Sequence, residues 1–122
     1  MRVSNVLAVV LVADFETSRA WYARLLGRAP DRVPMDGCAE WQLTRDGGLQ
    51  VVRDGAKAGS CHATFGVEDL ELQVAFLEKA GLVAGPIETG HMSTGETIRI
   101  ARLRDPDGNT IIFGEEPETR PG

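Results

Sequence analysis

Few residues in this chain combine a reactive type with a spacing that could do chemistry. The two histidines, His62 and His91, lie far apart in the sequence and match no metal-binding motif. Ser93 and Thr94 stand so close to His91 in one predicted loop that no independent acid could orient the imidazole as a catalytic triad requires. The glycine-rich stretch at residues 46–48 lacks the helix start of a phosphate-binding loop. Any functional site must therefore be assembled by the fold.

An internal repeat shows which elements would position such a site. The segment Val-Ala-Asp-Phe-Glu at residues 12–16 is echoed by Val-Glu-Asp-Leu-Glu at residues 67–71. Ala-Trp at residues 20–21 is echoed by Ala-Phe at residues 75–76, with the same separation of 55 residues. A repeat at a fixed offset indicates that one structural unit is used twice.

The first copy reads as a strand, a helix and a hairpin. An apolar, β-branched run at residues 6–12 predicts a buried strand, and Asp14 predicts the N-cap of the helix that follows. The hairpin is predicted from residues 41–45, a turn at residues 46–48, and residues 49–53. Gly27 predicts the end of the helix, whose buried face we expect to carry Ser18, Trp21, Tyr22, Leu25 and Leu26.

The second copy repeats this order of signals. Residues 61–67 predict the strand, Asp69 the N-cap, and Gly81 the end of a helix whose buried stripe includes Leu70, Val74 and Leu77. The remaining expected elements are a short strand near residues 86–89, a strand at 97–104, a turn at 105–109 and a strand at 110–114. Residues from 115 onward predict a frayed tail.

Length and composition indicate one folded body. A chain of 122 residues is long enough for one domain with its own core, so we expect a single domain, residues 1–122, with units at 1–56 and 60–116. The composition, 43% hydrophobic and 25% charged, is that of a globular protein. A net charge of −5 with scattered basic residues argues against nucleic-acid binding and favours a neutral or cationic small ligand.

The start of the chain does not predict export or membrane insertion. Asp14 closes the apolar run too early for a secretory signal, and the run is far short of a membrane span. We therefore expect a cytoplasmic protein without membrane association, in which Cys38 and Cys61 are free thiols.

The repeat, the helix with Trp21-Tyr22 at its middle, and the turn Asp-Pro-Asp-Gly-Asn at residues 105–109 resemble the vicinal-oxygen-chelate superfamily of glyoxalases, bleomycin-resistance proteins and extradiol dioxygenases. The resemblance covers nearly the whole chain and implies an α+β fold. In that fold two tandem βαβββ units form curved mixed sheets around a shared cleft. The turn itself is interpreted as structural, because proline, glycine and aspartate at these positions satisfy the needs of a tight turn.

Enzymes of this superfamily hold a divalent metal with four side chains, and the resemblance places those positions at Leu7, Gln50, His62 and Ile112. Only His62 is a good ligand, whereas a stable site normally needs three or four nitrogen, oxygen or sulfur donors. We therefore expect no metal and no other cofactor. The alternative interpretation of His62 is a histidine satisfied by a hydrogen bond to a neighbour.

The residues expected to line the cleft follow from these positions by alternation along each strand. The strand pattern of the superfamily further implies that Ile100 and Arg102 accompany Ile112. A two-residue turn at residues 46–47 or 47–48 would place Trp41 and Leu43 beside Gln50. Trp41 could then stack on a planar or cationic ring, and Arg102 could pair with a carboxylate or phosphate. Alternatively, these apolar residues fill a closed core or a subunit interface. The predicted ligand-binding residues are Leu7, Val9, Trp41, Leu43, Gln50, Val52, His62, Thr64, Ile100, Arg102 and Ile112.

Three functions are consistent with these patterns. The first is a metal-independent protein of the bleomycin-resistance type, which sequesters a small aromatic or cationic molecule and which, by resemblance, forms a homodimer. The second is a metal-dependent glyoxalase-like lyase, isomerase or dioxygenase, in which His91 or Glu115 adds a donor to His62 and Gln50. The third is an interaction module without a ligand. No catalytic residue is predicted under the first.

Overall fold

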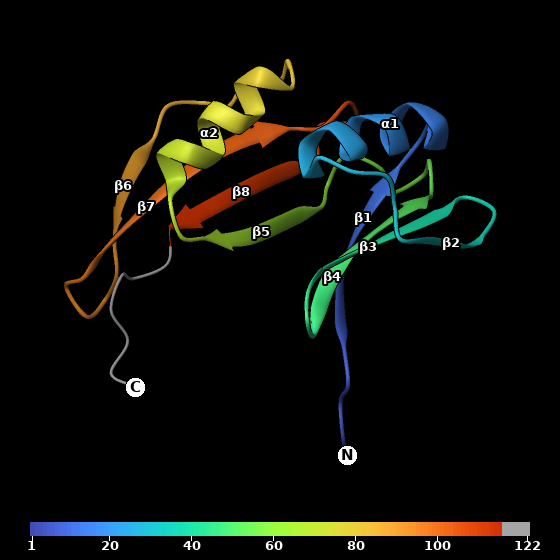
Figure 1. Ribbon diagram of the computed structural model, residues 1–122, viewed down its shortest axis with the longest axis horizontal. Coiled ribbons are helices and arrows are strands. Elements are labelled where there is room, and N and C mark those ends of the chain that lie inside the picture. Colours follow the sequence, from blue (N-terminus) through green and yellow to red (C-terminus); the bar gives the residue numbers. More distant parts are fainter. Residues whose placement is uncertain (116–122) are drawn as a thin grey trace. The chain divides into compact units, whose positions relative to one another are not determined.

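The computed structural model describes residues 1–115 and contains the same βαβββ order twice (Figure 1). Each copy forms a four-stranded mixed sheet, with strand orders β1-β4-β3-β2 and β5-β8-β7-β6, so the predicted α+β fold of two repeated units is confirmed. The elements are β1 (Val6–Val12), α1 (Phe15–Leu26), β2 (Arg32–Met35), β3 (Cys38–Thr44), β4 (Gly47–Arg53), β5 (His62–Val67), α2 (Leu70–Lys79), β6 (Glu88–His91), β7 (Thr97–Arg104) and β8 (Thr110–Glu115).

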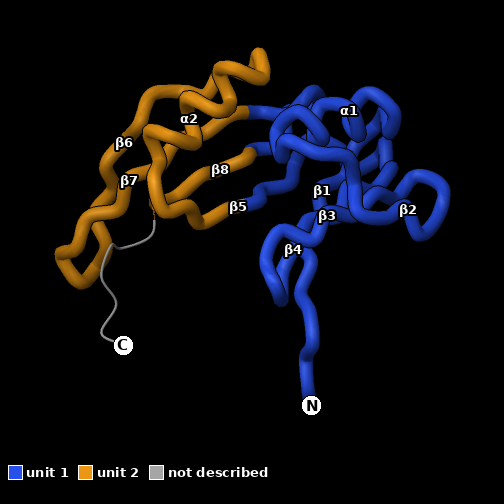
Figure 2. The backbone as a smooth tube through the Cα atoms, in the orientation of Figure 1, with its two compact units in different colours: residues 1–63, 104–110 blue, residues 64–103, 111–122 orange. Residues whose placement is uncertain are grey.

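The chain divides into two compact units that differ from the two sequence repeats at residues 60–63 and at residues 104–110 (Figure 2). The first unit comprises residues 1–63 together with residues 104–110, and the second comprises residues 64–103 and the described chain from residue 111 onward. The turn between β7 and β8 thus lies in the second repeat by sequence but in the first unit by contact.

Both helices begin at the predicted aspartates. The Asp14 carboxylate accepts a hydrogen bond from the Thr17 backbone N–H at 3.1 Å, and the Asp69 carboxylate accepts one from the Leu72 N–H at the same distance. Such caps satisfy backbone donors that the first helical turn leaves unpaired. Gly27 follows α1 in the left-handed conformation, φ 76°, which an L side chain would adopt only with strain.

In each unit the helix covers one face of its sheet (Figure 1). On the covered face of the first unit, alternate residues of β1 and β4 have no exposed surface: Val10, Val12, Leu49 and Val51. On the covered face of the second unit, Ala101 and Ile111 are fully buried, and the rings of Phe65 and Phe113 pack with their centroids 5.6 Å apart. Alternation therefore leaves the opposite face of each sheet uncovered by its own helix.

The turn at residues 105–109 is held in the first unit by buried polar contacts. The Tyr22 hydroxyl donates to the Asp105 carboxylate at 2.7 Å, and the Asn109 side-chain amide donates to the Leu11 carbonyl at 2.9 Å. The Asn109 side-chain oxygen accepts from the Cys61 N–H at 2.8 Å. Asp105 and Asn109 are 5% and 0% exposed, so this turn is part of the interior of the first unit. Its structural interpretation from sequence agrees with these contacts.

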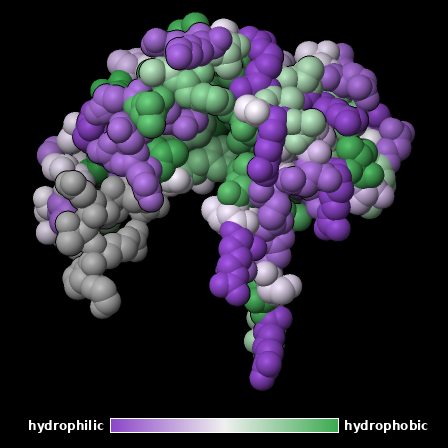
Figure 3. Space-filling view, in the orientation of Figure 1, coloured by the Kyte–Doolittle hydropathy of each residue, from purple (hydrophilic) through white to green (hydrophobic). Residues whose placement is uncertain are grey.

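Within residues 1–115, neither helix has the length and apolar content needed to cross a bilayer. The outer surface of α2 does carry two exposed apolar side chains, Leu72 and Phe76, at 68% and 43% exposure. Apolar surface is visible among polar side chains over this part of the chain in Figure 3.

Candidate functional site

One face of the sheet in the first unit offers a mixed apolar and polar surface. This face is opposite α1 and carries the residues that alternate with the buried ones, so it includes Leu7, Val9 and Leu11 of β1. Val9 is 43% exposed, whereas the next residue of the strand, Val10, is fully buried. Val52 of β4 is the register partner of Leu11 and adds to the apolar part of the face.

A single row of residues crosses all four strands on this face. Val9 is the register partner of Gln50, Gln50 of Glu40, and Glu40 of Arg32. Because directly opposed residues of neighbouring strands share a face, these four side chains lie side by side. We call them the polar row. Its order across the sheet is hydrocarbon, amide, carboxylate and guanidinium.

The Glu40 carboxylate is the centre of the polar row and has both oxygens occupied. Its Oε1 accepts from Arg32 Nε at 2.6 Å, and its Oε2 accepts from the Gln50 side-chain amide at 2.5 Å. The hydrogen bond from Arg32, followed by the one from Gln50, holds the pKa of Glu40 below its usual range. Glu40 is only 7% exposed, and the positive charge of Arg32 balances that of its carboxylate.

The corresponding face of the second unit's sheet carries three isoleucines and a charged pair. Ile98 is 37% exposed, and together with Ile100 it approaches the position that a side chain at Gly114 would occupy. Ile112 alternates with the buried residues of β8 and therefore lies on this face too. Arg102 shares the face and pairs with Glu88 of β6 at 3.4 Å. The predicted positions Ile100, Arg102 and Ile112 thus lie on one uncovered face.

Four more of the predicted residues, in β5 and β4, occupy uncovered positions of their sheets. His62 and Thr64 of β5 are exposed, whereas Ala63 between them is buried. Gln50 and Val52 of β4 are half-buried.

The predicted position of Trp41 is wrong. Its register partner is Leu49, not Gln50, and its ring is fully buried on the face covered by α1, with its centroid 6.4 Å from that of Tyr22. The indole N–H donates to the Arg28 carbonyl at 3.0 Å. Trp41 therefore fills the core and is not available to stack on a ligand. For Trp41 the structure thus agrees with the alternative stated from the sequence, in which these apolar residues fill a closed core.

The reason is a one-residue irregularity in the hairpin. The turn lies at residues 45–46, and the register shifts between Gln42 and Thr44, which leaves Leu43 without a partner. Leu43 is half-buried and has no partner on β4, where Gln50 is paired with Glu40. The prediction that Leu43 lies beside Gln50 is therefore wrong. A shift of one residue moves every side chain of a strand to the other face.

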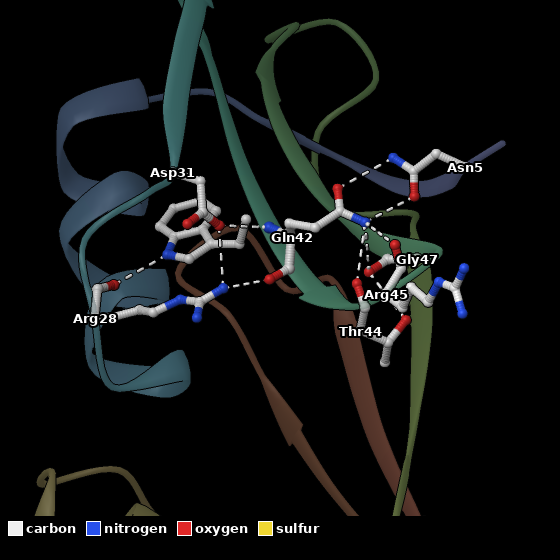
Figure 4. A network of polar contacts seen from close by, with 8 residues as sticks. Asn5, Arg28, Asp31, Gln42, Thr44, Arg45 and Gly47 are labelled. Atoms are coloured by element: carbon white, nitrogen blue, oxygen red, sulfur yellow. Dashed lines mark hydrogen bonds and ion pairs between the residues drawn. The ribbon is translucent and has the colours of Figure 1, made fainter.

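A polar network holds the shifted register in place (Figure 4). The Gln42 side-chain amide donates to Asn5 at 2.8 Å and to the Thr44 carbonyl at 3.1 Å, so it spans the bulge. The Gln42 N–H donates to the Asp31 carboxylate at 2.6 Å, and Asp31 in turn pairs with Arg28 at 3.0 Å.

The residues at the four superfamily metal positions do not fit a divalent metal. Leu7 and Ile112 offer only hydrocarbon, which cannot coordinate. The Gln50 NH2 donates to Glu40, and its amide oxygen alone is a weak ligand for such a metal. His62 is thus the one strong donor among the four, and a stable site needs three or four.

The further donors considered for a metal enzyme have other surroundings. Glu115 accepts from the Leu70 N–H at 3.0 Å and from Arg99 at 3.2 Å, so it caps α2 on the covered side of the sheet. Within residues 1–115 its carboxylate oxygens come within 4.8 Å of those of Asp69 and Glu71, but Arg99 bridges Glu71 and Glu115 and offsets their charge. His91 is an exposed residue of β6, opposite Thr97 of β7.

Sequence reasoning missed the two charged members of the polar row. Glu40 lies just before the predicted start of its strand, at residue 41, whereas the observed strand begins at Cys38. Arg32 belongs to β2, which the βαβββ order implies but for which no residue range was predicted. Glu40 could have been found from Gln50 by alternation, given the correct register. No alternation of apolar and polar residues marks β2, whose four residues are all exposed and include a proline.

Comparison with known proteins agrees with the fold. A sequence model of the glyoxalase-like domain matches residues 7–113, whereas no curated protein matches the sequence. A glyoxalase/bleomycin resistance protein from Catenulispora acidiphila is 37% identical, with a TM-score of 0.82 over 93% of this chain and 98% of that one. A protein of the same description from Albidiferax ferrireducens is 22% identical, with a TM-score of 0.69 over 90% and 97% of the two chains.

A bleomycin-binding protein complexed with bleomycin has the same fold at 18% identity, with a TM-score of 0.73 over 93% of this chain and 98% of that one. The family match spans most of the sequence, and the Catenulispora protein is similar over nearly all of both chains. The predicted resemblance to the vicinal-oxygen-chelate superfamily is thereby confirmed. This chain belongs to the glyoxalase-like domain family, within the group that includes the bleomycin resistance proteins.

Proposed function

We propose that the protein binds a small organic molecule without a metal and acts by sequestering it. The observation that carries this proposal is the uncovered sheet face of the first unit, where exposed apolar side chains adjoin the polar row. An apolar surface with a few fixed polar groups is the usual composition of a small-molecule site. A solved neighbour of the same fold is a bleomycin-binding protein in complex with bleomycin, so this fold accommodates a small-molecule ligand.

The chemistry of the face supports binding more than catalysis. Its carboxylate, Glu40, has a lowered pKa because Arg32 and Gln50 donate to its oxygens, so it is a weak base toward a substrate proton. No nucleophile with an adjacent base occurs among the members of the polar row. Sequestration requires neither. Sequestration in the cytoplasm would protect a cell from a toxic molecule, and this is the form of antibiotic resistance that we propose.

The proposal is tested with an uncharged fluorescent probe, N-phenyl-1-naphthylamine, titrated against the purified protein. We expect saturable binding of the dye and less than one equivalent of divalent metal by elemental analysis. Val9→Glu should abolish dye binding, because it places a charge in the apolar part of the face. Val83→Glu, a change of the same kind at a residue that is 86% exposed in the second unit, should leave binding unchanged.

Two results would count against the proposal. A stoichiometric metal that disappears together with turnover in His62→Ala would favour the metal-dependent enzyme. Absence of saturable dye binding would favour an interaction module. We also propose the homodimer implied by the resemblance, which light scattering coupled to size-exclusion chromatography measures directly.

A further inference from the structure

We propose that Arg32 is an anion-binding residue and that the ligand of this protein carries an acidic group, such as a carboxylate, beside an apolar body. This inference rests on the proposed function and specifies its ligand class. The net charge of −5 favours a neutral or cationic ligand, but the exposed donor groups of the binding face decide which ligand group can be bound there.

The guanidinium of Arg32 is held on one side and open on the other. Its Nε donates to Glu40 at 2.6 Å, and within the described chain its two terminal nitrogens form no hydrogen bond or ion pair. The side chain is 70% exposed, so these nitrogens are in reach of a ligand. A guanidinium presents its two terminal N–H groups as a planar fork that fits a carboxylate or phosphate with two parallel hydrogen bonds.

Glu40 is a positioning residue in this arrangement. A carboxylate that is 7% exposed and neutralised by an arginine is weak evidence for stability, because apolar residues at such positions are often as stabilising. Its two hydrogen bonds instead fix the side chains on either side, Arg32 and Gln50. This fixing lowers the entropy that Arg32 would otherwise lose when it binds a ligand.

Gln50 provides a second, complementary group. Because its NH2 donates to Glu40, its side-chain oxygen faces away from that carboxylate, and no donor within residues 1–115 occupies it. Gln50 and Arg32 are two strands apart, which separates their backbones by roughly 9–10 Å. Val9 lies beyond Gln50 in the same row. The row therefore suits a molecule with an acidic group at one end, a hydrogen-bond donor and an apolar part.

Two dyes that share an apolar body but differ in charge test the contribution of the acidic group to binding. 1-Anilinonaphthalene-8-sulfonate carries a sulfonate, whereas N-phenyl-1-naphthylamine is uncharged. Loss of a charge-assisted, forked contact should lower the affinity of Arg32→Gln for the sulfonate dye roughly tenfold. Its affinity for the uncharged dye should stay within about twofold, because that dye has no anion for the guanidinium to bind.

Arg53→Gln is the matched control. Arg53 belongs to the same sheet and pairs with an exposed aspartate, Asp36, but its register partner is Val12, so it lies on the face opposite the polar row. The same loss of charge at Arg53 should change neither affinity. Arg32→Lys retains the charge without the fork and should fall between the wild type and Arg32→Gln.

The outcomes distinguish the two proposals. If the uncharged dye binds saturably but Arg32→Gln leaves the sulfonate affinity unchanged, the acidic ligand class is wrong and the binding function stands. Equal weakening of both dyes would show that Arg32 maintains the face structurally, and would also overturn the anion site. If neither dye binds the wild type saturably, both proposals fail. Circular dichroism of each variant reports whether the fold is retained.

Discussion

The contact between Tyr22 and Asp105 allows the clearest test of how the first unit is held together. The Tyr22 ring is fully buried, and its hydroxyl donates to a carboxylate that is 5% exposed, at 2.7 Å. Burial, followed by this hydrogen bond, raises the pKa of Tyr22 well above its usual range, so the hydroxyl stays a donor at any pH where the protein is folded. Tyr22→Phe removes this donor and leaves the ring in place.

The expected cost follows from the groups that remain. A hydrogen bond to a charged group contributes about 1.5–3 kcal/mol. The oxygen that loses the Tyr22 hydroxyl still accepts from the Asn109 amide at 2.8 Å, so Asp105 is not left without a partner. We therefore expect a loss of about 2 kcal/mol in the free energy of unfolding. At a urea dependence of about 2 kcal/mol/M, the unfolding midpoint should fall by about 1 M.

Urea denaturation followed by circular dichroism measures this loss, and a double-mutant cycle with Asp105→Asn isolates the pairwise part. The coupling free energy should be about 1–2 kcal/mol, since the two groups are in direct contact. Asp46→Asn, at an exposed aspartate of the first hairpin turn, is the control and should change stability by less than about 0.5 kcal/mol. A coupling free energy near zero would refute the assignment of the turn to the interior of the first unit.

Three further predictions address the sheet of the first unit. Gly48→Ala should destabilise it strongly, because an added Cβ would lie 2.2 Å from the Trp41 carbonyl oxygen, whereas Gly55→Ala meets nothing within 4 Å and should be neutral; thermal unfolding compares the two. Trp41→Phe should lower the thermal midpoint yet leave dye affinity unchanged, because the ring lies in the core. The pKa of Glu40 is lowered in the folded state, so its contribution to stability is present above the unfolded-state pKa and is lost as pH falls through the folded-state value. Glu40→Gln removes this dependence. On acidification below about pH 4, the urea midpoint of Glu40→Gln should therefore fall less than that of the wild type.

The repeat and the helix caps could be predicted because they depend on local chemistry. An aspartate ahead of an apolar helix stripe satisfies free backbone N–H groups whatever the tertiary context, and both predicted caps do so. The strands Val6–Val12 and Thr97–Arg104 agree with their predicted bounds, since each is a long run of strand-forming residues ended by a turn signal. The offset of 55 residues then indicated the common βαβββ unit.

The face of Trp41 could not be predicted, because it depends on a single residue of register. A regular hairpin would place Trp41 on the face of Gln50. The observed turn begins one residue earlier than predicted, and the bulge at Leu43 moves Trp41 to the opposite face. Apolar and aromatic residues are stable on either face of such a strand, so composition does not decide between them. The side chain that does decide is Gln42, whose amide spans the bulge through contacts invisible in the sequence.

The two copies of the unit share a backbone arrangement but present different chemistry on their uncovered faces. In the first unit the edge strand carries the cation, Arg32, and the inner strand the anion, Glu40. In the second unit this order is reversed, with Glu88 on the edge strand and Arg102 on the inner one. The second pair is looser, with 3.4 Å between Arg102 Nε and the carboxylate and with both side chains more than half exposed, so it contributes little. Duplication therefore accounts for the frame, whereas the choice of ligand depends on residues in which the copies have diverged.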